Sequence, residues 1–136
     1  MIGTSIQILL PCPIIFKRNK LIQICSAVDH CLIINNWKPD GALRPAVTLS
    51  DPASGRSLEI LTDQPGIQVY TGNYLDSSLT GKDGTTYRQH AAICLETECF
   101  PNAINQTEWH GEWPSGRLNP GETYKHTMLH RFTTGY

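Results

Sequence analysis

Charge is scarce in this sequence and nearly balanced. Asp, Glu, Lys and Arg make up 17% of the 136 residues, and the formal net charge is −1. A nucleic-acid-binding protein needs a basic surface, and the basic run at residues 17–20 is too short to provide one. Hydrophobic residues make up 40%, as in globular proteins, and the length predicts one domain. We therefore expect a neutral or small-molecule partner and no nucleic acid.

The sequence also lacks an apolar run long enough to cross a membrane. Ile6 to Phe16 is apolar, but Pro11 and Pro13 interrupt it and positive charge follows it. A membrane helix needs about 20 apolar residues, and a signal peptide carries its positive charge before the apolar run. We predict no membrane segment. Residues 1–26 are interpreted as a divergent leader of uncertain structure, either a strand pair or sequence foreign to the fold, and residues 27–136 as the domain.

Signatures of disulfide, metal or nucleophilic chemistry are missing as well. The cysteines show no C-x-x-C spacing and do not resemble a secreted disulfide framework. Reduced thiols in a cytoplasmic protein explain them most simply, and Cys94 and Cys99 are expected to be packing thiols because no cation neighbours them in sequence. The chain has no glycine-rich phosphate loop, no serine nucleophile elbow and no catalytic carboxylate pair.

Short β-branched and alternating segments dominate what remains. No segment shows a convincing helical pattern, so the predicted fold class is all-β. Asp51-Pro52-Ala53-Ser54-Gly55 separates two alternating segments and is the clearest hairpin turn in the chain. The predicted strands are residues 31–34, 46–49, 57–62, 67–70, 89–96 and 123–132, and the predicted loops are 37–45, 71–87 and 102–121.

Two groups of residues allow both a functional and a structural interpretation. His126 and His130 have a spacing that binds zinc on a helix, but on a strand four residues cover about 13 Å. Because that distance exceeds the reach of a shared metal, we expect no metal site there. Trp109 and Trp113 lie in the long loop, where they either stack on a sugar ring or anchor the loop.

Glu96 is the most informative acidic residue because it follows an apolar strand. An acid in such a place is either a general base whose basicity its surroundings raise, or a strand-end carboxylate that reaches water. Asp29 and Gln68 are also predicted near a strand end or on an exposed strand face, so the three side chains could converge. Carboxylates and amides match sugar hydroxyls as acceptors and donors, which suggests a polyhydroxylated neutral ligand.

Several blocks of the sequence, taken together and in order, resemble the C-terminal portion of the aldose 1-epimerase (galactose mutarotase) family. The resemblance covers roughly Ala27 to Phe132. Its blocks are Asp29-His30 before a hydrophobic strand, Pro65-Gly66-Ile67-Gln68-Val69-Tyr70-Thr71-Gly72-Asn73, Cys94-Leu95-Glu96-Thr97 with Phe100-Pro101, and Pro120-Gly121-Glu122-Thr123-Tyr124.

The resemblance implies a β-supersandwich fold, here truncated at its N-terminal side, and an isomerase that interconverts the α and β anomers of hexoses without a metal or organic cofactor. Glu96 matches the family's catalytic base, while Asp29 and Gln68 match residues that contact the sugar. No segment matches the upstream segment that carries the acid histidine of the family, and His30 is expected to point to the other face of its strand.

Three hypotheses follow from this comparison. The first is a truncated epimerase that is impaired or inactive alone, with exposed sheet edges that favour self-association. The second is a non-catalytic carbohydrate-binding remnant that uses Asp29, Gln68 and Glu96 as ligands only. The third is a fragment without function.

Overall fold

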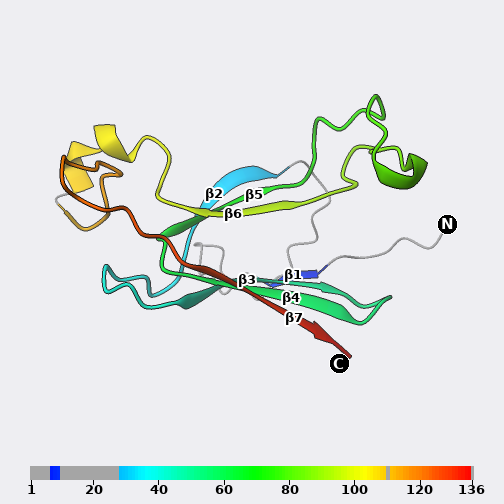
Figure 1. The fold of residues 1–136 in the computed structure, drawn as a ribbon, viewed down its shortest axis with the longest axis horizontal. Coiled ribbons are helices and arrows are strands. Elements are labelled where there is room, and N and C mark those ends of the chain that lie inside the picture. The colour runs from blue at the N-terminus through cyan, green and yellow to red at the C-terminus, as the bar shows by residue number, and fades with distance from the viewer. Residues whose placement is uncertain (1–6, 10–27, 110, 136) are drawn as a thin grey trace.

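The computed structural model describes residues 7–9, 28–109 and 111–135. In this part of the chain two antiparallel sheets face one another, one with the strand order β1-β3-β4-β7 and the other with the order β2-β5-β6 (Figure 1). The strands are β1 Gln7–Leu9, β2 Asp29–Ile33, β3 Arg44–Asp51, β4 Arg56–Thr62, β5 Gly66–Tyr70, β6 Cys94–Glu98 and β7 Met128–Thr134.

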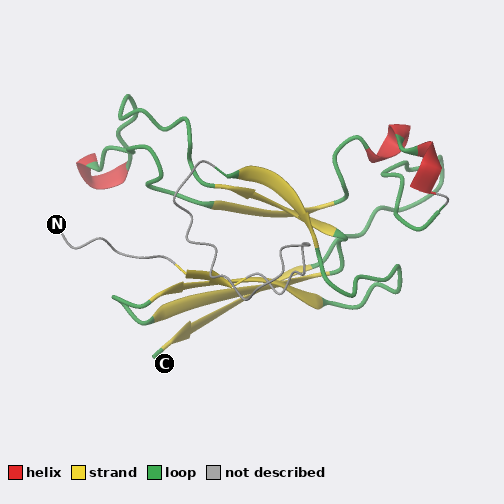
Figure 2. Cartoon of the chain, turned by 180° about the vertical axis from the view of Figure 1, so that it is seen from behind, coloured by secondary structure: helices red, strands yellow, loops and turns green. Residues whose placement is uncertain are grey.

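The helices in the described residues are single 3₁₀ turns, all of them in loops at the two ends of the sheets (Figure 2). They are η1 Lys82–Gly84, η2 Ala103–Asn105 and η3 Thr107–Trp109. The all-β prediction is therefore confirmed. No described helix has the length and apolar character that a membrane span requires.

The predicted hairpin joins β3 to β4. The backbone N–H of Gly55 donates to the carbonyl oxygen of Asp51 over 2.9 Å, and the Asp51 carboxylate accepts from the N–H of Ala53 over 3.1 Å. Gly55 has φ +68°, a left-handed conformation that glycine adopts without a steric penalty. The aspartate and the glycine of the turn thus fix the register, which pairs Asp51 with Arg56.

The core lies between the two sheets. Side chains alternate across each strand, so Ile67 and Val69 point from β5 toward the four-stranded sheet and are only 1% and 2% exposed. Ile34, Ala46, Val47, Ile60 and Ile67 form the buried cluster, and Leu32, Leu49, Leu58, Ile93 and Leu95 pack against it. The other face of β2, β5 and β6 is thereby left for polar side chains.

Two predicted strands are shorter than the sequence suggested. The strand expected at 89–96 begins only at Cys94, because His90 has φ +60° and bonds the turn at Thr71 and Gly72 instead of a neighbouring strand. The strand expected at 123–132 is Met128–Thr134, since its partner β4 ends at Thr62, opposite Met128.

The segment predicted as a leader, residues 1–26, lies outside the described residues apart from Gln7–Leu9. These three residues form β1 and pair with β3 in the register Gln7 to Ser50.

Candidate functional site

The sheet β2-β5-β6 brings the three predicted site residues together on its outer face. The antiparallel register places Gln68 of β5 directly opposite Glu96 of β6, a relation that puts their Cβ atoms about 4.5–5.5 Å apart. Asp29 is the first residue of β2, diagonal to Gln68, and shares its face. Sequence positions that are far apart therefore converge because both pairings around β5 are in register.

A hydrogen bond joins two of these side chains directly. Nε2 of Gln68 donates to Oδ1 of Asp29 over 2.6 Å, a short bond because its acceptor is a carboxylate. It also fixes the Gln68 amide, whose oxygen is left to accept from another group. His30, the neighbour of Asp29, lies opposite Val69 and therefore alternates to the other face, as expected from the sequence.

Glu96 lies in the middle of β6, whereas the sequence suggested a strand end. Its side chain is exposed, so the apolar surroundings expected around a buried base are absent. No hydrogen bond or ion pair joins its carboxylate to another described residue. Both oxygens are therefore free to accept a proton or a hydroxyl group from a ligand on this face.

Cys31 lies in the middle of β2, directly opposite Gln68, and its thiol interacts with Glu98, which lies toward the end of the outer face remote from Asp29. Burial, and after it the neighbouring Glu98 carboxylate, raise the pKa of the Cys31 thiol from 9.0 to about 12. A Cβ atom added to Gly66 would lie 3.0 Å from both the Cys31 sulfur and the Phe100 ring, so glycine is what lets the chain pack here. The Cys31 thiol is therefore partly covered beside Gln68, and its raised pKa makes it a weak nucleophile at neutral pH.

Cys94 at the start of β6 and Cys99 just after the strand differ in exposure. Burial raises the pKa of Cys99, whose Sγ donates to the carbonyl oxygen of Pro114 over 3.4 Å, as a packing thiol should. Cys94 is exposed, however, because it shares the outer face with Glu96 two residues further on. Its expected role as a packing thiol is wrong.

His126 and Thr97 connect the two sheets. Nε2 of His126 is hydrogen-bonded to Oγ1 of Thr97 over 3.0 Å and to Oγ1 of Thr62 over 3.3 Å. Thr97 and Thr62 are buried, and their hydroxyl groups also contact Met128 Sδ and the N–H of Gln64, so the ring completes a buried polar network between the sheets. Thr97 of the Leu-Glu-Thr block is therefore an inner-face residue that supports β6, the strand that carries Glu96.

The two tryptophans of the long loop both pack on Phe100, which follows β6, and one of them also packs on Trp37. The ring of Trp113 stacks on Trp37 with centroids 5.3 Å apart and meets the edge of Phe100 at 5.1 Å. Trp109 also packs edge-on against Phe100, at 5.7 Å. These contacts favour the interpretation that the tryptophans anchor the loop.

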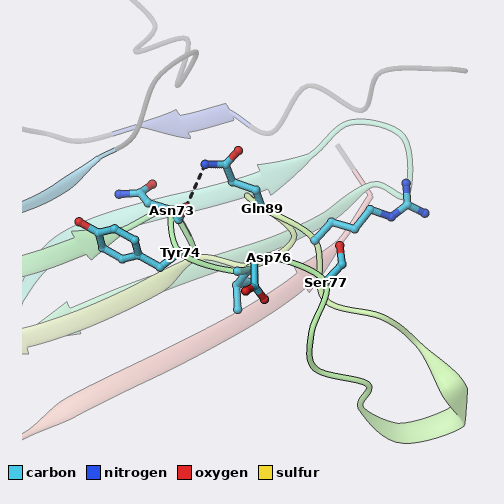
Figure 3. A pocket seen from close by; sticks show the side chains of 7 residues that line it. Asn73, Tyr74, Asp76, Ser77 and Gln89 are labelled. Carbon is cyan, nitrogen blue, oxygen red and sulfur yellow. Dashed lines mark hydrogen bonds between the residues drawn. The ribbon is translucent and has the colours of Figure 1, made fainter.

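A shallow depression of about 600 Å³ opens beside the end of the sheet where β2 begins (Figure 3). It does not include the three site residues, which lie on the flat sheet face, and so it is not a closed pocket around them. It is lined by two loop segments, whose residues are Asn73, Tyr74, Leu75, Asp76, Ser77, Arg88 and Gln89.

An all-β protein with two carboxylates and an amide on one open sheet face has the polar groups of a carbohydrate site. The chain matches the family described as Aldose 1-epimerase over residues 4–131. It belongs to that family, and its two antiparallel sheets are consistent with the fold that the resemblance implied.

Similarity to individual proteins agrees with this family membership. The chain is similar to galactose mutarotase from Sus scrofa (42% identical over 117 residues, 86% of this chain and 27% of the relative). It is also similar to galactose mutarotase from Homo sapiens (49% over 81 residues, 60% and 22%) and to aldose 1-epimerase from Haemophilus influenzae (40% over 88 residues, 64% and 24%). The chain thus spans about a quarter of the length of these relatives.

Proposed function

We propose that the chain carries the base side of an aldose 1-epimerase site and acts on hexoses such as galactose and glucose. The observation that carries the proposal is the Asp29–Gln68–Glu96 arrangement, held by the β2-β5-β6 register and the 2.6 Å bond. Family membership and the names of the relatives support the substrate class.

In the proposed reaction Glu96 removes the proton of the anomeric hydroxyl. The bond between C1 and the ring oxygen breaks as the ring oxygen gains a proton, and the open-chain aldehyde forms. Rotation about the C1–C2 bond and closure by the reverse proton transfers give the other anomer. Asp29 and Gln68 hold sugar hydroxyls during these steps, and the reaction consumes no cofactor.

The acid that protonates the ring oxygen is proposed to be missing from this face. In the described part of the chain, His30 points to the other face and His126 is held by Thr62 and Thr97. His90 contacts the carbonyl oxygen of Thr71, and His130 stacks on Phe132. A missing acid group costs about 10²- to 10⁴-fold in rate, so the chain alone is impaired or inactive.

Polarimetry with α-galactose tests the proposal. A rate above spontaneous mutarotation that Glu96→Gln abolishes supports catalysis, and Glu112→Gln, at an exposed position of the long loop, is the matched control. Galactose binding without turnover would leave the carbohydrate-binding remnant, and absence of both would leave the fragment without function.

The same proposal covers partners and location. Cys31, Cys94 and Cys99 are free thiols, which supports a reducing, cytoplasmic location. We propose self-association through the outer strands β2, β6, β1 and β7, which lack a second partner among the described residues. We propose neither a nucleic-acid nor a membrane partner.

A further inference from the structure

The residue before Asp29 is held by side chains from the turn that follows β5. The N–H of Val28 donates to Oγ1 of Thr71 over 3.0 Å, and the carbonyl oxygen of Val28 accepts from Nδ2 of Asn73 over 3.0 Å. The N–H of Thr71 donates to the same carbonyl oxygen over 3.1 Å. We call Val28, Thr71 and Asn73 the Val28 clamp.

The bonds within the Val28 clamp fix the orientation of the Asn73 amide. Because the Val28 carbonyl oxygen can only accept, the Asn73 atom that contacts it is the Nδ2 donor. Oδ1 then faces Oγ1 of Thr71, which donates to it over 2.7 Å and also lies 3.3 Å from the Val28 carbonyl oxygen. Thr71 is only 5% exposed, which shields these bonds from competition by water. The clamp therefore continues the β2–β5 ladder past its last backbone pair, Asp29 with Tyr70.

The segment leading into β6 supports the clamp from outside. Nδ1 of His90 is 2.8 Å from the carbonyl oxygen of Thr71 and, because a carbonyl only accepts, carries the proton. The N–H of His90 donates to the carbonyl oxygen of Gly72 over 3.1 Å, and Nε2 of Gln89 donates to that of Asn73 over 2.9 Å (Figure 3). The same segment continues into the strand that carries Glu96, so the clamp is tied to both sides of the site.

We propose that Thr71 and Asn73 are positioning residues that fix Asp29 for its contact with Gln68 and with the sugar, an inference that rests on the proposed function. Asp29 is exposed and begins an outer strand, a place where strands open easily. Its bond to Gln68 is also exposed, and water competes for it. The bond therefore keeps its 2.6 Å geometry only if the backbone at Val28 holds Asp29 in place. Site geometry is sensitive, because a displacement of about 1 Å can cost 10²-fold in rate.

The first test needs no sugar. In the nitrogen-15 NMR spectrum of the whole chain, the Gln68 side-chain amide is expected to show one proton shifted by its bond to Asp29. Thr71→Val keeps the shape but removes the hydroxyl, and should return this signal to the position of a free amide. Thr71→Ser keeps the hydroxyl and should retain the signal, and Thr48→Val, in β3, is the matched control. An unchanged Gln68 signal in a folded Thr71→Val protein overturns the proposal.

Two further measurements keep the proposal testable if Thr71→Val does not fold. Asn73→Asp replaces the Nδ2 donor with a charged carboxylate oxygen that the Val28 carbonyl oxygen repels, and should move the same Gln68 signal. In the unsubstituted chain, the Val28 amide should exchange with solvent as slowly as the amides of the β2–β5 ladder. Rapid exchange at Val28 beside a protected ladder overturns the clamp.

Galactose titration separates this inference from the proposed function. Thr71→Val is expected to weaken galactose binding about 10-fold, within the range that misplacement of a contact group produces, and Thr71→Ser to restore it. If the Gln68 signal responds as expected but the unsubstituted chain binds no galactose, the sugar role of the clamp falls together with the proposed function, while its hold on Asp29 stands. Unchanged galactose binding in Thr71→Val overturns the positioning role alone.

Discussion

The two faces of the sheet β2-β5-β6 come from the same strands, but one is part of the core and the other carries the candidate site. On the inner face, Ile67, Val69 and Thr97 are buried against the four-stranded sheet. On the outer face, Glu96 and Asp29 are exposed and Gln68 is only partly covered. Alternate residues along each strand therefore serve the core and the proposed site. A substitution on one face should have limited effect on the property that depends on the other face.

The largest expected difference lies within the outer face and concerns its thiols. Because the pKa of Cys31 is about 12, its thiolate fraction at pH 8 is roughly 1000-fold below that of a thiol at 9.0. Iodoacetamide at pH 8 should modify the exposed Cys94 first, and Cys31 should become reactive only as the pH rises toward 12. Peptide mass spectrometry measures both sites, with the urea-unfolded chain as the control. Equal labelling of the two cysteines in the folded chain would contradict the partial burial and raised pKa of the Cys31 thiol.

Shortening an inner-face side chain should unfold the protein most readily. Ile67 is 1% exposed, and Ile67→Ala is expected to lower the free energy of unfolding by about 2–5 kcal/mol through lost burial and the remaining cavity. Urea denaturation followed by tryptophan fluorescence measures this change. A loss below about 1 kcal/mol would show that the two sheets do not share a tight core.

The bond between the sheets should contribute less than the apolar core. Thr97→Val removes the hydroxyl that is 3.0 Å from Nε2 of His126, and is expected to cost about 1–2 kcal/mol. Thr97→Ser, which keeps the hydroxyl, controls for the bond and should recover part of the loss. If both variants are equally unstable, packing of the Thr97 methyl group accounts for the effect instead.

The smallest effect on stability is expected at Glu96, the residue that we propose as the base. Glu96→Gln should change the free energy of unfolding by less than about 0.5 kcal/mol, because the side chain is exposed and has no partner among the described residues. The same urea titration measures it. A destabilisation comparable to that of Thr97→Val would contradict the view that outer-face side chains contribute little to stability.

Local sequence signals predicted part of this fold well. The hairpin at residues 51–55 and the strand at 67–70 depend on neighbouring residues, and both were predicted correctly. The start of β6 was not, because the conformation of His90 is set by bonds to Thr71 and Gly72 far back in the chain. The start of β7 likewise depends on where its partner β4 ends. Non-local pairing, which no single segment encodes, decides such boundaries.

The candidate site shows the same limit. Family-like blocks pointed to Asp29, Gln68 and Glu96, but their proximity depends on two strand registers that the sequence alone does not give. The positioning role proposed for Thr71 and Asn73 has no counterpart among the predictions from sequence, which place residues 71–87 in a loop. Their hydroxyl and amide, directly after a predicted strand, were the available signal, since such side chains often bond nearby backbone.

The alternation of the two faces along each strand also limits how this chain can change in length. A one-residue insertion or deletion in β5 that shifted the pairing would turn Gln68 into the core and Ile67 toward water, since a one-step slip exchanges the faces of a strand. In the long connection between β5 and β6, a change of length does not exchange the faces of a strand. Only the turn at 71–73 and its contacts with residues 89–90 need a constant spacing there. Length variation among related chains should therefore collect in residues 74–88, while the spacing from Gly66 to Asn73 stays constant.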